Sequence, residues 1–263
     1  MIVAQITDLH VKRKGHLLHH MINTAKSLRR CVERLNELDP RPDVIVATGD
    51  LTESGKRKEY ARLRDVLERS EIPVYLMPGN HDDRERLRDA FPDHAYLPER
   101  DAPLSYVLES FPVRIVALDS TDPGYRGGCF DEQRERWLRA RLREAPSRPT
   151  FLFMHHPPFL TGIRQLDNDP YRRVEVLGEV VRANPQIQLV GAGHIHRAMQ
   201  VRWQGTMACT APSTAHQIVL ELREKQPLGM TLEPPGFLLH VWDPDYGTVT
   251  HVCATERFKT RWL

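Results

Sequence analysis

Short apolar runs, each stopped by polar residues, recur through the first 190 positions of the chain. Such near-continuous runs are typical of strands buried on both faces. Amphipathic, arginine-rich stretches lie between them and predict helices, so strand and helix alternate. This alternation predicts an α/β protein. The predicted strands are 2–6, 43–48, 73–77, 113–118, 150–154 and 187–190, and the predicted helices are 20–38, 56–70, 83–90, 131–144 and 171–183.

The pattern changes after residue 197, where the predicted helices stop. Only short strand-like segments follow, at 198–203, 206–210, 216–222, 236–243 and 247–253. Two sheets packed face to face between helices would accommodate both parts, so we expect one domain over residues 1–263. Pro and Gly are concentrated in residues 223–236, which predicts a long excursion. It could be a cap over a site, an oligomer contact or a solvated hairpin.

Charge and composition limit the class of partner. The 37 Lys and Arg against 35 Asp and Glu leave a net charge of +2, too little by itself to attract a nucleic acid polymer or an anionic membrane. No apolar run is long enough to span a membrane, and no signal peptide precedes the first strand, so a cytoplasmic location is expected. Four widely spaced cysteines predict buried free thiols rather than a disulfide framework. They are Cys31, Cys129, Cys209 and Cys253.

Five polar blocks stand where predicted strands end. Loops at the carboxyl ends of strands form the ligand crevice of α/β proteins, so the blocks should converge. Their carboxylates, imidazoles and amide, without a thiolate, suit zinc, iron or manganese. Any single block could instead be a cap, a turn or a satisfied histidine, but five after successive strands argue for a metal site. The blocks are Asp8-Leu9-His10, Gly49-Asp50, Gly79-Asn80-His81-Asp82, His155-His156-Pro157-Pro158 and Gly193-His194-Ile195-His196.

Other catalytic motifs are incomplete. The run Gly191-Ala192-Gly193 lacks the third glycine of a dinucleotide fingerprint, and Ser54-Gly55-Lys56 lacks the frame of a phosphate-binding loop. A Gly-x-Ser-x-Gly nucleophile elbow is absent from the sequence. The histidines His16, His19 and His20 fall in a loop and a helix start, which favours a solvated surface.

In their order, the five blocks resemble the motifs of the calcineurin-like metallophosphoesterase superfamily: D-x-H, G-D, G-N-H-D/E, H and G-H-x-H. They cover residues 8–196, about three quarters of the chain. The surroundings of the third and fourth blocks, residues 77–83 and 153–158, are most similar to the bacterial class III cyclic-nucleotide and glycerophosphodiester phosphodiesterases. The resemblance implies a four-layer αββα sandwich of two mixed sheets. It also implies a binuclear centre of two divalent ions, with iron, manganese, zinc and cobalt as candidates.

Carried over motif by motif, the resemblance implies seven metal ligands. They are Asp8, His10 and His196 for one ion, Asn80, His155 and His194 for the other, and Asp50 as the bridge between both. Residues i and i+2 leaving a strand share a face, which independently supports a common ion for Asp8 and His10. Spacing does not decide which ion His194 or His196 holds, and only the family pattern prefers His155 over His156. The expected catalytic residues are Asp50 and His81, with His81 as a proton donor or transition-state stabiliser.

The implied activity is hydrolysis of small phosphodiesters, namely glycerophosphodiesters, 3',5'-cyclic nucleotides or both, by a hydroxide that the two ions activate. The alternatives are a phosphomonoesterase or nucleotide pyrophosphatase of the same superfamily, and an inactive scaffold. The loops at 11–20, 119–130, 157–170 and 211–216 should select the substrate, but their contents do not identify it. Those contents include Arg126, Phe159, Arg164 and His216. Family resemblance also makes the C-terminal portion, about 198–263, a candidate homo-oligomer contact.

Overall fold

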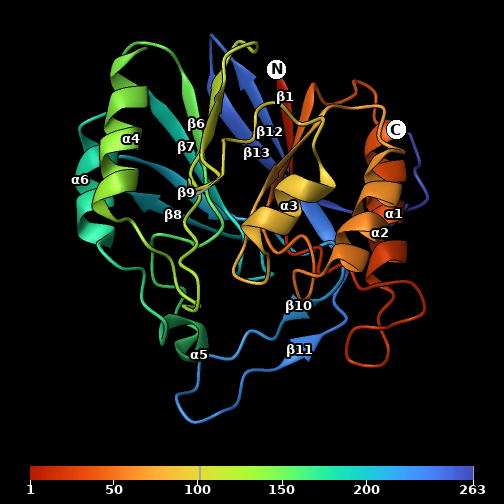
Figure 1. Cartoon of the computed structure of the whole chain (residues 1–263). Helices are drawn as coiled ribbons and strands as arrows, with labels where there is room; N and C mark the ends of the chain where they lie inside the picture. Colours follow the sequence, from red (N-terminus) through yellow and green to blue (C-terminus); the bar gives the residue numbers. More distant parts are fainter. Residues whose placement is uncertain (101, 263) are drawn as a thin grey trace.

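The computed structural model describes residues 1–100 and 102–262, and its centre consists of two mixed sheets lying between two groups of helices (Figure 1). The first sheet has the order β13-β12-β1-β2-β3, in which β1, β2 and β3 run parallel. Strands β12 and β13 extend it in antiparallel fashion beside β1. The C-terminal strands are therefore built into the same sheet as the N-terminus. Their bounds are β1 Ile2–Ile6, β2 Val44–Thr48, β3 Val74–Met77, β12 Gly236–Asp243 and β13 Gly247–Ala254.

The second sheet has the order β4-β5-β6-β7-β9-β8. Its strands β5, β6, β7 and β9 are parallel, and β4 and β8 close the two edges in antiparallel pairing. The four central strands are near-continuous apolar segments because both of their faces are covered. The bounds are β4 Tyr106–Leu108, β5 Arg114–Ala117, β6 Thr150–Phe153, β7 Ile187–Ala192, β8 Met199–Trp203 and β9 Thr206–Thr210.

Helices cover the outer face of each sheet, which gives four layers with three apolar cores between them in the described structure. One core lies between the first sheet and helices α1 to α3, a second between the sheets, and a third between the second sheet and helices α4 and α6 (Figure 1). The predicted αββα arrangement of two mixed sheets is confirmed. No helix in the described ranges is long and apolar enough to cross a membrane. The bounds are α1 Thr24–Asn36, α2 Arg57–Leu67, α3 Arg84–Ala90, α4 Glu132–Arg143, α5 Arg164–Asp167 and α6 Val174–Arg182.

A buried polar network joins the two sheets directly behind the strand ends. The Gln5 amide on β1 donates to Thr48 Oγ1 at 3.0 Å and to the Ala192 carbonyl at 2.8 Å. Its oxygen lies 3.1 Å from His240 Nε2 on β12, and His240 Nδ1 lies 2.9 Å from Thr250 Oγ1. The ends of β1, β2 and β7 are thereby held in fixed relation, and these are the ends that carry three of the polar blocks.

The segment after β9 differs from its prediction. The expected strand over 216–222 is reduced to β10, Gln217–Ile218, which pairs with β11, Met230–Thr231. Leu220 and Leu222 beyond this strand are exposed, and no sheet in the described part of the chain covers them. Together β10 and β11 form a small arm that lies beside α5 at the bottom of Figure 1. Strand β4 and the four-residue helix α5 are further elements that the periodicity did not predict.

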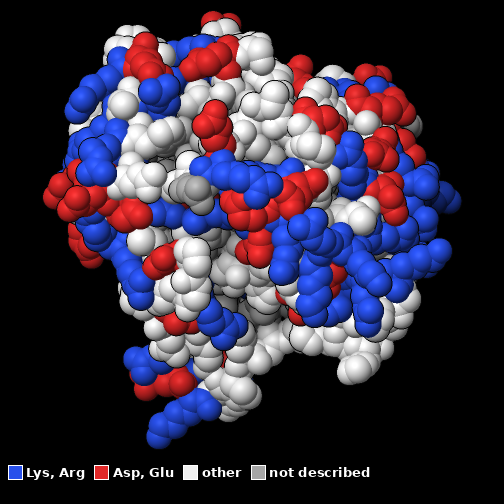
Figure 2. Space-filling model, viewed as in Figure 1, with Lys and Arg blue, Asp and Glu red and all other residues white. Residues whose placement is uncertain are grey.

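Two expectations from composition are met in the described structure. The thiols of Cys31, Cys129 and Cys209 are buried and free, and Cys253 is free and half-buried. Basic and acidic side chains are interspersed over the face shown in Figure 2, as the near balance of 37 basic and 35 acidic residues suggests. The electrostatic field of this face is therefore mixed rather than of a single sign.

Candidate metal centre

All seven predicted donor residues converge at the carboxyl ends of the central strands. Asp8 and His10 follow β1, Asp50 follows β2, Asn80 follows β3, His155 follows β6, and His194 and His196 follow β7. Most of them are buried: Asp8 and His155 are inaccessible to solvent, and Asp50 is 2% exposed. Asn80, His81 and His194 are partly exposed. These three therefore mark the face from which a substrate can reach the centre.

Three of the donors form a tight group beside Asp50. His10 Nε2 and His196 Nε2 are 3.1 Å apart, and Asp8 Oδ1 lies 3.4 Å from His196 Nε2. Asp50 Oδ2 is 3.5 Å from His10 Nε2. Two imidazole nitrogens that meet between two carboxylates are a donor set suited to a divalent ion of the zinc or iron class. The residues present thus fit the ion that the motifs imply.

A second group meets the other oxygen of Asp50. His155 Nε2 lies 3.4 Å from Asp50 Oδ1 and 3.2 Å from Asn80 Oδ1. The His194 ring lies beside that of His155, with centroids 5.2 Å apart. Asp50 therefore directs one oxygen toward each group, the geometry that a bridging carboxylate requires.

The two adjacent histidines after β6 have different surroundings. His155 Nδ1 donates to the Thr48 carbonyl at 2.8 Å, which leaves Nε2 directed into the donor set. Both ring nitrogens of His156 are engaged, Nδ1 with Ser120 Oγ and Nε2 with the Arg126 carbonyl, each at 2.9 Å. His156 thus anchors the loop at 119–130, and His155 is the histidine with a nitrogen free to bind an ion.

The backbone at the donor residues is strained. Positive φ values occur at nine non-glycine residues in the described ranges, and such values are unfavourable for side chains with a Cβ. Five of the nine belong to the donor set: Asp8 (51°), His10 (43°), Asp50 (48°), His194 (69°) and His196 (53°). Two glycines make room for these turns. A Cβ on Gly79 would collide with Asp50, and one on Gly49, at φ 97°, would collide with His155.

Burial and ion pairing oppose each other in the electrostatics of the donors. Burial lowers the pKa of both His194 and His196 to about 3, so these rings are neutral. Burial alone would raise the pKa of Asp50, but His155 and His10 hold it well below its ordinary value. The pKa of His155 is raised to about 9, because the Asp50 charge outweighs burial. A metal ion binds neutral imidazole, so ion binding would release a proton from His155.

His81 lies next to the donor set without belonging to either group. Its backbone N–H donates to Asp50 Oδ1 at 2.9 Å. Its ring Nδ1 donates to the Glu53 carbonyl at 2.9 Å, and its Nε2 lies 4.0 Å from Asp50 Oδ2. Because 33% of the His81 side chain is exposed, the ring is accessible from the substrate side.

Two carboxylates near the centre were given no role by the sequence analysis. The Asp82 carboxylate accepts hydrogen bonds from the backbone N–H groups of Leu51, Thr52 and Gly79, at 2.9, 3.1 and 3.0 Å. It therefore fixes the turns that carry Asp50 and Asn80. Glu53 Oε2 lies 2.8 Å from His10 Nδ1. An acidic residue three positions after Asp50 was the available signal, but nothing in the sequence indicates its partner.

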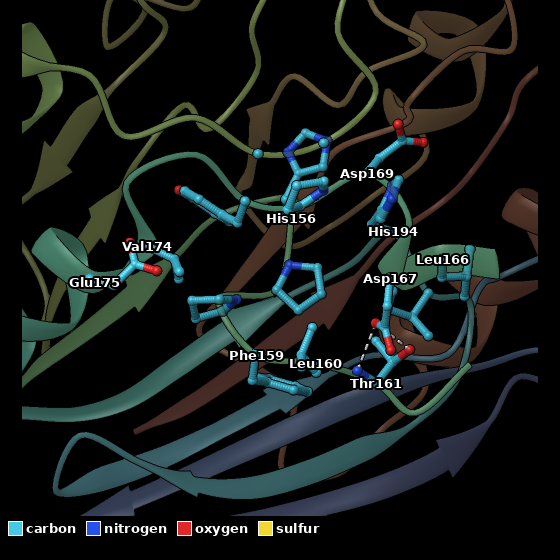
Figure 3. A pocket seen from close by; sticks show the side chains of 17 residues that line it. His156, Phe159, Leu160, Thr161, Leu166, Asp167, Asp169, Val174, Glu175 and His194 are labelled. Carbon is cyan, nitrogen blue, oxygen red and sulfur yellow. Dashed lines mark hydrogen bonds between the residues drawn. The ribbon is translucent and has the colours of Figure 1, made fainter. Parts of the chain in front are cut away.

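Two of the predicted substrate loops, 119–130 and 157–170, line cavities beside the partly exposed residues. A cavity of about 300 Å³ adjoins His194 and has Phe159, Leu160 and Val174 among its walls (Figure 3). Another, of about 440 Å³, begins at Asn80 and includes Arg84. These two cavities provide space next to the centre, one at His194 and the other at Asn80.

The remaining residues singled out from the sequence are divided between the centre and the surface. His216 is buried beside His196, with ring centroids 4.5 Å apart. His16, His19 and His20 are exposed. Arg126 is also exposed, and the exposed Arg164 pairs with Glu224 on the β10–β11 arm at 3.1 Å. Neither arginine is part of the donor set.

Known phosphoesterases are similar in sequence to this chain. A family model described as calcineurin-like phosphoesterase matches residues 1–198. A protein of Arcobacter nitrofigilis named probable glycerophosphodiester phosphodiesterase GpdQ is 35% identical over 261 residues, 98% of this chain and 95% of the relative. The 3',5'-cyclic adenosine monophosphate phosphodiesterase CpdA of Escherichia coli is 30% identical over 82% of this chain and 76% of its own length.

Two solved structures share the fold at low sequence identity. A dimetal phosphatase from Danio rerio superposes with a TM-score of 0.64 at 16% identity, covering 97% of this chain and 99% of its own. GAP50, described as the anchor in the inner membrane complex of Plasmodium, superposes with a TM-score of 0.66 at 14% identity, covering 100% of this chain and 87% of its own. One of these proteins is named as an enzyme and the other as an anchor, so the fold alone does not decide the activity.

Proposed function

The chain belongs to the calcineurin-like phosphoesterase family, as its motif blocks predicted, and we propose that it is a metal-dependent phosphodiesterase acting on small phosphodiesters. The observation that carries the proposal is the arrangement of six donor side chains in two groups, with Asp50 directing one carboxylate oxygen toward each group. The substrate classes we propose are glycerophosphodiesters and 3',5'-cyclic nucleotides, because relatives at 35% and 30% identity carry these names.

We assign one divalent ion to Asp8, His10 and His196, a second to Asn80, His155 and His194, and the bridge to Asp50. The Nε2 separation of 3.1 Å between His10 and His196 supports the first assignment, and the contacts of His155 Nε2 support the second. Two such ions, when bound, supply Lewis acidity to the phosphoryl oxygens and lower the pKa of a coordinated water. Iron, manganese, zinc and cobalt are the candidate metals, since their preferred ligands overlap.

His81 is proposed to act on the substrate rather than on an ion. A carbonyl only accepts hydrogen bonds, so the contact with Glu53 O places a proton on His81 Nδ1. Nε2 is then the ring atom available to the substrate, and in the protonated ring it can donate a hydrogen bond. There it would deliver a proton to the departing oxygen or stabilise charge on the phosphoryl group.

Two features favour diesters over monoesters. The five motif blocks contain no Lys or Arg to offset the second charge of a monoester, and Arg164 is paired with Glu224. Arg84 beside Asn80 is also engaged, with Asp119 at 2.6 Å. In addition, the cavities at His194 and at Asn80 could receive the two alcohol groups of a diester. A phosphomonoesterase or nucleotide pyrophosphatase is the alternative activity within the family.

The wider setting stays a proposal from the sequence. We expect one domain over residues 1–263, a cytoplasmic location and no nucleic acid polymer as substrate. Strand β12 lies beside β1 in one sheet, which supports a single domain. The β10–β11 arm exposes Leu220 and Leu222, a feature consistent with a cap or a homo-oligomer contact. An inactive scaffold is less favoured, because it would not require strained residues at five donor positions.

Turnover of matched model substrates tests the proposal. The metal-loaded protein should hydrolyse bis(p-nitrophenyl) phosphate with a higher kcat/KM than p-nitrophenyl phosphate, and a chelator should abolish both activities. Asp8→Asn should lose activity, whereas the control Asp65→Asn, whose side chain is 66% exposed on α2, should not. A tenfold preference for the monoester, about 1.4 kcal/mol, would favour the alternative. Full activity of Asp8→Asn would refute the metal assignment.

A further inference from the structure

Glu53 lies behind the proposed metal ligand His10, on the side of the ring away from the donor set. Its Oε2 is 2.8 Å from His10 Nδ1, and His10 Nε2 faces His196 and Asp50. His10 is 4% exposed, so this contact is largely shielded from solvent. The carboxylate therefore fixes both the tautomer and the orientation of the imidazole.

The Nδ1 atoms of two other proposed ligands, His155 and His196, contact neutral carbonyl groups instead of a carboxylate. His155 Nδ1 contacts the Thr48 carbonyl at 2.8 Å, and His196 Nδ1 contacts the His216 carbonyl at 3.2 Å. A hydrogen bond to an ionised acceptor is stronger than one to a neutral acceptor. It also makes the imidazole a more basic ligand. The two ion positions consequently differ in the support that lies behind them.

Glu53 is itself held in place by its neighbours. Its backbone N–H donates to the Val11 carbonyl at 3.4 Å. The preceding residues Leu51 and Thr52 are fixed by Asp82. Its side chain is only 22% exposed. Because the segment is tied to the loop after β1 and to the turn after β3, the carboxylate is positioned before any ion binds.

We propose that Glu53 is a positioning residue that orients His10 and selectively strengthens ion binding at the position formed by Asp8, His10 and His196. This inference rests on the metal assignment in the proposed function. Glu53 also orients His81, but through its backbone carbonyl, which side-chain substitution leaves in place. The two roles of the residue can therefore be separated by experiment.

Calorimetric titration of metal-free protein with Zn²⁺, and with Co²⁺ followed by its absorption spectrum, measures both ion positions. Glu53→Ala should raise one of the two dissociation constants by about 10- to 100-fold and leave the other within about twofold of its wild-type value. Glu53→Gln keeps a hydrogen-bond acceptor without the charge, so it should give an intermediate loss. The control is Glu33→Gln on α1, whose side chain is 53% exposed, and it should bind both ions like the wild type.

The remaining readouts separate this inference from a structural role and from the proposed function. The melting temperature of metal-free Glu53→Ala should fall modestly, because the buried His10 Nδ1 loses its partner, while the loss of ion binding should still be confined to one position. A lower melting temperature with equal weakening at both positions would assign Glu53 a structural role and overturn the inference. Unchanged dissociation constants in Glu53→Ala would also overturn it, while leaving the proposed function intact if the wild type binds two ions. Absence of any ion binding by the wild type would instead refute the proposed function.

Discussion

Replacing Gln5 by methionine should destabilise the metal-free protein by about 2–6 kcal/mol, because Gln5 joins the two sheets through buried hydrogen bonds. The side chain is inaccessible to solvent, and methionine has a similar length but cannot form these bonds. Thr48 Oγ1 would keep its contact with the Ile6 carbonyl at 3.4 Å, and the Ala192 carbonyl would keep the Ala211 N–H at 3.0 Å. Each of these two losses costs about 0.5–1.5 kcal/mol.

The third loss is larger, because His240 Nε2 would remain buried without a partner, at about 1–3 kcal/mol. This term can be isolated with His240→Phe, since the His240 ring packs against both Phe151 and Phe153, with centroids 6.0 and 5.8 Å away. In the double variant the unpaired nitrogen is absent. The double variant should therefore be more stable than the sum of the two single changes predicts.

Urea unfolding of the metal-free variants measures these differences, and thermal melting should show a fall of roughly 2–4 °C per kcal/mol. The control Gln200→Met, at an exposed position on β8, should change stability by less than about 0.5 kcal/mol. A Gln5→Met protein within about 1 kcal/mol of the wild type would show that the hydrogen bonds of Gln5 contribute little to stability. Strict additivity in the double variant would show that Gln5 and His240 do not act together.

Three further predictions concern the ions, the reaction and the pH dependence of stability. Elemental analysis of protein supplied with excess metal should find close to two ions per chain. Asp50→Ala should hold no more than one, because it lacks the carboxylate between the two groups of donors. Two ions in this variant would contradict the role of Asp50 as a bridge. His81→Ala should retain both ions while kcat falls by roughly 10²–10⁴-fold. If His81 protonates the leaving oxygen, the loss should be larger on glycerophosphodiesters than on nitrophenyl diesters. If it stabilises charge on the phosphoryl oxygens, the two losses should be equal. Burial lowers the pKa of His240 from 6.5 to about 3 in the folded protein. Between these two pH values the unfolded chain binds a proton that the folded protein does not bind. Stability therefore falls as the pH falls, by up to about 1.4 kcal/mol per pH unit. Urea unfolding from pH 7 to pH 4 should therefore show a shallower dependence for His240→Phe than for the wild type.

The convergence of the site was predictable because strand direction determines it. An apolar run followed at once by a donor residue needs only the parallel arrangement of β1, β2 and β3 to bring Asp8, Asp50 and Asn80 to one edge. The contact between Glu53 and His10 was not predictable, because the two residues are 43 positions apart in the sequence. Their meeting depends on how the loops after β1 and β2 fold over the sheet.

The two adjacent histidines, His155 and His156, show the same limit. Either could begin the same motif, and Ser120 and the Arg126 carbonyl, which engage both nitrogens of His156, come from a distant loop.

The strand predicted over 216–222 was too long for a different reason. Periodicity shows which residues are apolar, but it does not show whether a neighbouring strand exists to pair with them. Leu220 and Leu222 fit the pattern and are nevertheless exposed.

Strain at the donor residues leads to a last prediction: at a strained position a glycine variant should be more stable than an alanine variant, the reverse of the usual order. His194 has φ 69°, a conformation that costs a residue with a Cβ about 1–2 kcal/mol. His194→Gly should therefore leave the metal-free protein more stable than His194→Ala by about 1 kcal/mol. At the exposed His251 on the extended strand β13, alanine should instead be the better residue by about 0.5–1 kcal/mol. Urea unfolding of the four metal-free variants tests the reversal. If alanine is favoured at both positions, the left-handed turn at His194 is not a source of strain. If the reversal is found, retaining a histidine there lowers stability in exchange for a metal ligand, as expected where function and stability compete.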